Sequence, residues 1–262
     1  MPEGDTLHRT AAGLAPHLVG RPVTAARVRA GGPQVQRIVG ATITGIEAVG
    51  KNLLIRFDNG LELRTHLRMN GSWHRYRPGE RWRRPASRAR LVIEVPGAVA
   101  VCFDAPVVEL FEARAEAIHP TLSRLGPDLL APDYGPDDGA EARRRLLEPA
   151  RATATISAAL LDQQAQAGIG NIWRNETLFH ERIDPWTRVA DLDDETLDRL
   201  IATARRLLRQ SVGEAPGRMP MRVYRRAGRP CRRCRTPIQS APLSAENPRT
   251  TYWCPSCQSR SR

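Results

Sequence analysis

The first residues of the chain, MPEGDTLHRT, place a proline behind the initiator methionine and a carboxylate behind the proline. A small second residue permits removal of Met1, which would leave Pro2 with a free secondary amine. An α-amine has a reference pKa of about 8, so about 10 % of it is unprotonated at neutral pH, against about 0.04 % of a lysine. Such an amine can attack an aldehyde-like sugar carbon and form an iminium, with Glu3 as the adjacent acid or base. The same two residues could instead begin a helix and do no chemistry.

Lys51 is the single lysine among 40 Lys and Arg residues. It stands at the start of a predicted β-hairpin, where it could supply positive charge for a phosphate beside the reacting sugar. A genome rich in arginine codons would explain the Arg/Lys ratio but not the net charge of +12. Arginine suits bidentate phosphate contacts, so the charge favours nucleic acid as the partner.

Four cysteines form two C-x2-C pairs, CRRC and CPSC, with 19 residues between them. Four thiolates on two tight turns can close tetrahedrally around Zn²⁺ at about 2.3 Å. We expect one structural zinc ion per chain, because a closed four-cysteine site leaves no coordination position for a substrate. Two disulfides are the alternative, which an intracellular context disfavours. The four residues are Cys231, Cys234, Cys254 and Cys257.

Two further stretches could bind phosphate. In QAGIGNIWRNETLF, Gly168 is placed to end one helix and Asn171 to cap the next, where backbone N–H groups and the amide would form an anion site. In NPRTTYWC, Arg249 stands where a zinc hairpin would turn back, with Tyr252 and Trp253 as packing supports. An ordinary surface arginine is the alternative for Arg249.

Helical and β elements must position these groups in the first half of the chain. Apolar residues at helical spacing predict a helix over 5–18 that ends near Gly20. Alternating apolar residues on both sides of Asn59-Gly60 predict a hairpin over 52–67, and a second strand pair flanks Pro96-Gly97. Residues 23–110 therefore predict an all-β block, a sandwich, interrupted by an exposed charged loop at 77–90.

The second half of the chain has a different character. Patterning predicts helices over 138–147, 155–163, 171–180 and 192–210, followed by a short linker and a Cys-, Arg- and Pro-rich end. We therefore expect a multidomain α+β protein. Its domains would be an N-terminal helix and β-sandwich at 1–120, a helical domain at 121–222 and a four-cysteine zinc-finger hairpin at 223–262.

Hydrophobic residues make up 41 % of the 262 residues, which is enough for one large or two modest cores. The sequence contains no long apolar run and no basic-then-apolar leader. We expect a cytoplasmic, nucleoid-associated protein that is not secreted, has no membrane partner and is monomeric.

The order and spacing of five motifs resemble those of the formamidopyrimidine-DNA glycosylase/endonuclease VIII family, on the endonuclease VIII side. The motifs are PEG, VGKNLLIRF, HLRMNG, GIGNIWRNETLF and VYRRAGRPCRRC…TTYWCPSC. The resemblance covers nearly the whole chain. It implies a β-sandwich domain, a helix-two-turn-helix domain and a zinc finger, with damaged DNA as the ligand.

The resemblance also implies roles for individual residues. Pro2 matches the nucleophile that attacks C1′, Glu3 the residue that assists ring opening and proton transfer, and Lys51 the catalytic lysine. Asn171 and Arg249 match a pair that binds the phosphates around the lesion. A further match is Met69, whose counterpart fills the gap left by the flipped nucleotide, with core packing as the alternative. The implied reaction is base excision followed by β,δ-elimination.

The sequence departs from the family pattern at several places. Thr6 stands where a glutamate is common, and the segment 211–222 is short for a lesion-capping loop. The Arg-Phe pair that, with the counterpart of Met69, fills the gap in the DNA is missing from 105–112. The two cysteine pairs are also more widely spaced than is usual. Thr6 and the short segment favour oxidised pyrimidines and abasic sites over 8-oxoguanine. The missing pair makes single-stranded as well as double-stranded substrates plausible.

Two other functions remain compatible with the sequence. One is an 8-oxoguanine/formamidopyrimidine glycosylase. The other is a non-catalytic zinc-finger DNA-binding protein of the same fold, which would not need Pro2, Glu3 or Lys51. A zinc-ribbon RNA-binding module would leave the GIGN segment and the N-terminal motif without a role.

Overall fold

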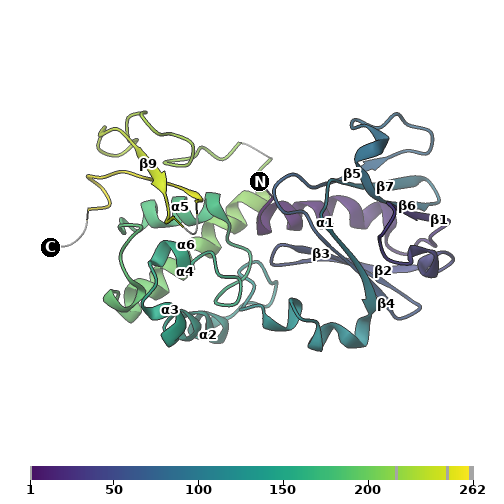
Figure 1. Cartoon of the computed structure of the whole chain (residues 1–262), viewed down its shortest axis with the longest axis horizontal. Helices are drawn as coiled ribbons and strands as arrows, with labels where there is room; N and C mark the ends of the chain where they lie inside the picture. The colour runs from purple at the N-terminus through teal and green to yellow at the C-terminus, as the bar shows by residue number, and fades with distance from the viewer. Residues whose placement is uncertain (1, 216–217, 246–247, 260–262) are drawn as a thin grey trace. The chain divides into compact units, whose positions relative to one another are not determined.

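The computed structural model describes residues 2–215, 218–245 and 248–259 (Figure 1). The chain divides between Arg124 and Leu125 into two compact units, and each is built around its own apolar cores. The first predicted domain boundary, at 120/121, lies close to this division, whereas the second, at 222/223, falls inside the second unit.

The first unit begins with helix α1, Gly4–Leu18. Its buried stripe consists of Leu7, Ala11, Leu14 and Leu18, as the apolar spacing predicts. The helix packs against β2 and β3 (Figure 1). Gly20 follows with a φ of +78°, a left-handed conformation that suits glycine after a helix.

Two four-stranded antiparallel sheets follow α1, with strand orders β1-β6-β7-β5 and β2-β3-β4-β8. Apolar residues of both sheets and of α1 share one core, which makes this unit a β-sandwich with an N-terminal helix, as predicted. Glycines with positive φ at Gly60 and Gly97 close the two predicted hairpins. The strands are β1 Ala25–Val28, β2 Ile43–Val49, β3 Asn52–Phe57, β4 Leu61–His66, β5 Ser72–Tyr76, β6 Ala89–Val95, β7 Ala98–Phe103 and β8 Val107–Glu112.

The charged loop at 77–90 is more ordered than its composition suggests. Its arginines are mostly exposed, but Trp82 is half-buried and packs on Tyr76 and Phe103, with ring centroids 6.1 and 5.9 Å away. The loop is therefore anchored to the sheet by an aromatic cluster. Short 3₁₀ turns occur here and elsewhere: η1 Val35–Ile38, η2 Ala86–Arg88, η3 Ala113–Ile118, η4 Leu122–Arg124 and η5 Val189–Asp191.

The second unit consists of helices followed by one small hairpin. Its core is lined by α2, α4, α5 and α6, and the broad apolar face of α6 supplies much of it. The elements are α2 Pro136–Leu146, α3 Pro149–Ala152, α4 Ile156–Ala159, α5 Asn171–His180, α6 Asp194–Gly213, β9 Gln239–Pro242 and β10 Thr250–Trp253.

The predicted helix over 155–163 is wrong beyond its first turn, because α4 ends at Ala159. The side chain of Gln163 accepts a hydrogen bond from the Gly168 N–H and donates to the Ile169 carbonyl, at 3.1 Å each. The side chain of Asp162 accepts from the N–H of Gln164 at 2.9 Å. These local bonds fold the chain into a loop in place of about one further helical turn.

Within the described residues, none of the helices combines the length and the apolar character that crossing a bilayer would require.

Candidate functional site

Pro2 lies at the edge of a surface hollow of about 400 Å³ in the first unit. The hollow is also lined by Thr6 of α1, by the turn that carries Met69, and by two arginines of the segment between β5 and β6. The folded unit therefore brings the N-terminal segment together with Met69. The lining residues are Pro2, Thr6, Met69, Asn70, Gly71, Arg84 and Arg88.

Glu3 is the N-cap residue of α1 and is 1 % exposed. Its backbone carbonyl accepts hydrogen bonds from the N–H groups of Thr6 and Leu7 at 3.0 and 3.2 Å. Its side chain makes no capping hydrogen bond. Helix capping therefore accounts for the backbone at this position but not for the choice of a buried carboxylate next to Pro2.

Lys51 lies in the tight turn between β2 and β3, where basic residues gather. Asn52 pairs with His66 across β3 and β4. Burial, and after it the positive charges of Arg64, Arg68 and Lys51, together lower the pKa of His66 to about 4. The His66 Nδ1 accepts a hydrogen bond from the Arg68 N–H at 3.1 Å. The imidazole is thus neutral at physiological pH, and the local charge favours an anion.

Met69 is 61 % exposed, so the alternative of core packing is wrong. It sits in the turn between β4 and β5, which is closed by a hydrogen bond from the Gly71 N–H to the Leu67 carbonyl at 2.9 Å. A Cβ at Gly71 would come within 2.6 Å of that carbonyl oxygen, so the turn requires glycine there. Arg68 adopts a φ of +49°. This tight geometry presents Met69 to solvent beside Pro2.

In the second unit, Asn171 is the first residue of α5 and is 7 % exposed. The prediction that it caps the helix is wrong, because Gly170 is the N-cap residue. The Asn171 amide instead donates to the carbonyl of Thr250 at 3.0 Å. Gly168 has a φ of +102° but lies in the loop, well after the end of α4, so it is not a helix C-cap.

Arg249 is exposed and immediately precedes β10. Its carbonyl accepts a hydrogen bond from the Leu243 N–H at 3.0 Å, which continues the β9–β10 pairing toward the tip. Residues 246 and 247 of the tip lie outside the described part of the chain. Because Asn171 contacts Thr250, the two predicted phosphate-binding residues, Asn171 and Arg249, lie close together in this unit.

Three side chains at helical spacing on α5 hold this hairpin. Besides Asn171, the buried Arg174 donates from Nη2 to the Thr250 carbonyl at 3.2 Å and to the Thr251 hydroxyl at 3.0 Å. Asn175 accepts from the N–H of Tyr252 at 2.8 Å. The i, i+3, i+4 spacing of polar residues is the signal in the sequence for this contact, which was not predicted.

Glu176 is a second residue whose role was not predicted from the sequence. Its carboxylate is 3 % exposed and accepts the backbone N–H groups of Arg222, Val223 and Tyr224 at 2.8, 3.0 and 2.9 Å. These bonds tie α5 to the segment that leads into the first cysteine pair. A glutamate in the middle of an otherwise buried helix was the available signal.

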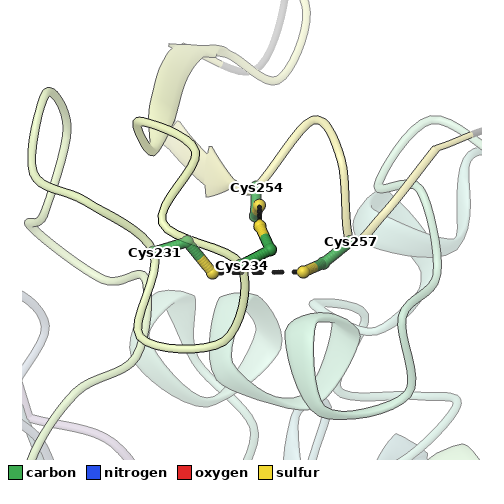
Figure 2. Close-up of side chains that lie close together, drawn as sticks. All are labelled: Cys231, Cys234, Cys254 and Cys257. Carbon is green, nitrogen blue, oxygen red and sulfur yellow. Dashed lines mark hydrogen bonds between the residues drawn. The ribbon is translucent and has the colours of Figure 1, made fainter.

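The four cysteines converge, and their sulfur atoms all lie within 4.8 Å of one another (Figure 2). The Sγ atoms of Cys234 and Cys254 are 3.4 Å apart and those of Cys231 and Cys257 are 4.0 Å apart. Tetrahedral coordination at a Zn–S distance of about 2.3 Å requires sulfur separations of about 3.8 Å. Disulfides, at about 2.05 Å, do not fit these distances. The cluster could hold a metal ion.

The environment of the cluster also suits a cation. Burial raises the pKa of the Cys254 thiol to about 12, whereas hydrogen bonds, those from Thr236 foremost, lower that of the Cys234 thiol to about 6. The Arg233 N–H donates to the sulfur of Cys231 at 3.3 Å, a turn geometry that supports a thiolate ligand. The fifth cysteine, Cys102, is buried in β7 of the first unit, as predicted for a core residue.

Comparison with protein families and with curated proteins identifies relatives of the whole chain. Residues 1–106 match the formamidopyrimidine-DNA glycosylase N-terminal domain and residues 125–219 the formamidopyrimidine-DNA glycosylase H2TH domain. The chain is 36 % identical to the probable endonuclease 8 2 of Streptomyces coelicolor, over 98 % of this chain and 94 % of that protein. It is 35 % identical to the DNA-(apurinic or apyrimidinic site) lyase Nei2 of Mycolicibacterium smegmatis, over 100 % of both.

The fold has a close structural counterpart as well. The crystal structure of Lactococcus lactis formamidopyrimidine-DNA glycosylase bound to DNA with an AP site superposes with a TM-score of 0.84, at 23 % identity. The match covers 98 % of this chain and 100 % of that one.

Proposed function

The chain belongs to the formamidopyrimidine-DNA glycosylase/endonuclease VIII family, and on that premise we propose that it removes oxidised pyrimidines from DNA and cleaves abasic sites. Full-length relatives named endonuclease 8 and DNA-(apurinic or apyrimidinic site) lyase support a bifunctional glycosylase and lyase. The observation that carries the proposed mechanism is the hollow in which partly buried Pro2 lies beside the exposed Met69.

The reaction uses the Pro2 amine as nucleophile. Its nitrogen bonds to C1′ of the damaged nucleotide, the N-glycosidic bond breaks, and the base leaves with a proton. Opening of the sugar ring then gives an iminium between Pro2 and C1′. Glu3, buried next to Pro2, supplies a proton to the ring oxygen at that step.

Strand cleavage follows from the iminium acting as an electron sink. Loss of a C2′ proton expels the 3′-phosphate in β-elimination, and a second elimination expels the 5′-phosphate. Hydrolysis of the remaining iminium releases the sugar fragment and regenerates the Pro2 amine. The amine, the carboxyl group and water supply the chemistry of each of these steps.

Four residues bind the DNA around the reacting nucleotide in this proposal. Lys51, in its cluster of basic residues, holds a phosphate, and Asn171 with Arg249 holds another at the junction of α5 and the hairpin. Met69 fills the gap that the flipped nucleotide leaves. Its exposure and its place beside Pro2 support this role.

The cysteine cluster holds one structural Zn²⁺ in this proposal. Cys231, Cys234, Cys254 and Cys257 would supply its four ligands, so the ion would stabilise the fold of the hairpin that carries Arg249.

Thr6 and the segment 211–222 support oxidised pyrimidines as the lesion. Thr6 lines the hollow, where its small side chain replaces the glutamate common in the family. Residues 216 and 217 of the segment lie outside the described residues. We further propose that the protein acts as a cytoplasmic monomer on both double-stranded and single-stranded damaged DNA.

Borohydride trapping tests the mechanism. The untagged protein is mixed with abasic-site DNA and reductant, and the crosslink is mapped by mass spectrometry. We expect it at Pro2, and no crosslink at Pro2 in protein that retains Met1, because the Pro2 nitrogen is then an amide and is not nucleophilic. A crosslink at Lys51 would overturn the assignment of the nucleophile. Tight binding without any crosslink, after confirmed removal of Met1, would instead support a DNA-binding protein without activity.

A further inference from the structure

One wall of the hollow beside Pro2 carries positive charge that the proposed reaction does not use. Arg84 and Arg88, from the segment between β5 and β6, line this wall. Their side chains are 31 % and 50 % exposed, so both reach the surface of the hollow.

One carboxylate orients both arginines. Asp104 accepts from Arg84 Nη1 at 2.7 Å and from Arg88 Nε at 2.9 Å. These hydrogen bonds, that from Arg88 foremost, hold the pKa of Asp104 below its usual range. Asp104 directly follows β7 with a φ of +53°, a conformation that costs a non-glycine residue energy and aims the carboxylate. Two guanidinium groups share one negative charge, so the cluster keeps a net positive charge.

Arg84 still has donors for a ligand. All its hydrogen bonds to the described residues come from Nη1, which also donates to the Asn70 carbonyl at 3.3 Å. Its Nε and Nη2 therefore remain to bind an acceptor. Arg88 uses Nε and Nη2 for Asp104, which leaves its Nη1. A planar guanidinium with donors already oriented is suited to a phosphate oxygen.

We propose that Arg84 and Arg88 form a binding subsite for a DNA phosphodiester on the wall of the Pro2 hollow, with Asp104 as the residue that orients them. The inference rests on the proposed function, because it takes DNA as the ligand of the hollow. The subsite contributes to the affinity for damaged DNA, and this contribution does not depend on the base sequence. The bond from Arg84 to Asn70 also links phosphate binding to the turn that carries Met69.

Salt-dependent binding tests the subsite. The affinity of Arg84→Gln for a duplex with a tetrahydrofuran abasic-site analogue is measured by fluorescence anisotropy over a range of salt concentrations. Loss of one phosphate contact is expected to lower the slope of log K against log salt by about 0.9. The affinity should fall about tenfold, equally for every base opposite the analogue. Arg84→Lys keeps the charge and should keep the slope.

Arg77→Gln is the matched control, since it removes the same charge from the same loop at an exposed position outside the hollow. An unchanged slope in folded Arg84→Gln, or an equal loss of slope in Arg77→Gln, would overturn the proposal. Should Arg84→Gln fail to fold, Arg88→Gln provides the same measurement. Trapping of the wild type on an abasic duplex reports separately on the proposed function.

Discussion

Glu62 carries a fully buried carboxyl group in β4 of the first unit. It lies 3.3 Å from Arg56 Nε, and the same guanidinium also pairs with Glu47 and Glu116. Burial, and after it the negative charge of Glu116, together raise the pKa of Glu62 to about 7. Arg56 thus pairs with three carboxyl groups, and that of Glu62, which is buried, is the least able to ionise.

This raised pKa makes stability depend on pH. The native state holds the Glu62 proton up to about pH 7, whereas the unfolded chain releases it near 4.5, so the free energy of unfolding falls as the pH rises between these values. We expect Glu62→Gln to be about 1–3 kcal/mol more stable than the wild type at about pH 8 and similar to it at about pH 4. Urea unfolding at both values measures the difference.

Glu112→Gln, at an exposed position of β8, is the control and should show no such dependence on pH. Equal stability of Glu62→Gln and wild type at about pH 8 would show that Glu62 is ionised at no cost in the native protein.

The residues that could be predicted from the sequence are those whose side chains or amines are reactive or bind metals. Pro2 and Glu3 could be proposed because an amine and a carboxylate side by side suggest a reaction, and the cysteines because their spacing suggests a metal. The hydrogen-bond partner of Asn171 could not be predicted, because Thr250 is far away in the chain and only the fold brings them together. The same holds for Arg84, whose partner Asp104 lies 20 residues further along the chain, just after β7.

At the scale of elements, α5 and the β9–β10 hairpin form one structural piece. The buried guanidinium of Arg174 satisfies the Thr250 carbonyl and the Thr251 hydroxyl, and Asn175 holds the next N–H group along the hairpin. Arg249 is attached directly to this docked segment. The position of its charge therefore depends on α5.

We expect Arg174→Met to loosen the hairpin, because it removes two hydrogen bonds from a site that excludes water. The free energy of unfolding should fall by about 1–3 kcal/mol, and DNA affinity should fall as well, since Arg249 is less well held. Thermal melts and binding to abasic-analogue DNA measure the two effects. Arg209→Met on the exposed side of α6 controls for loss of charge. A variant as stable and as tightly binding as this control would contradict the structural role.

Elements with strong local signals were predicted well. The hairpins at Gly60 and Gly97 were predicted because glycine adopts the positive φ of a tight turn without steric cost. Helix α6 was predicted because its apolar face is long. The helix beyond Ala159 was wrongly predicted because propensity cannot anticipate a side chain such as Gln163 bonding back to the main chain.

At the scale of the whole molecule, the two compact units depend on different sources of stability. The first unit has a shared apolar core of helix and two sheets, whereas the end of the second has a small cluster around Cys231 and Cys254 with few apolar residues. A metal ion at the four sulfurs would supply what this small cluster lacks. The first unit needs no such support.

Chelation of the metal should therefore act locally. After treatment with a strong chelator and mild denaturant, we expect amide hydrogen exchange to rise in 223–245 and 248–259 and to stay unchanged in the first unit, while DNA binding weakens. Mass spectrometry of peptic fragments measures both regions in one sample, and re-addition of Zn²⁺ should restore protection. An equal rise in exchange across both units, or no change in exchange in either unit, would contradict a structural metal at Cys231, Cys234, Cys254 and Cys257.

The turn between β2 and β3 has one more consequence, for handling the molecule rather than for its reaction. Because Lys51 is the sole lysine, the chain offers a single ε-amine to acylating reagents and a single cleavage position to a lysine-specific protease. A dye on this ε-amine would lie beside the basic cluster, once the Pro2 amine, which loses its proton at a lower pH, has been reversibly blocked. A nick after Lys51 would separate two strands that remain hydrogen-bonded to each other, from Val49–Asn52 onward. The native sequence thus offers one ε-amine and one lysine-specific cleavage position, both in the turn between β2 and β3.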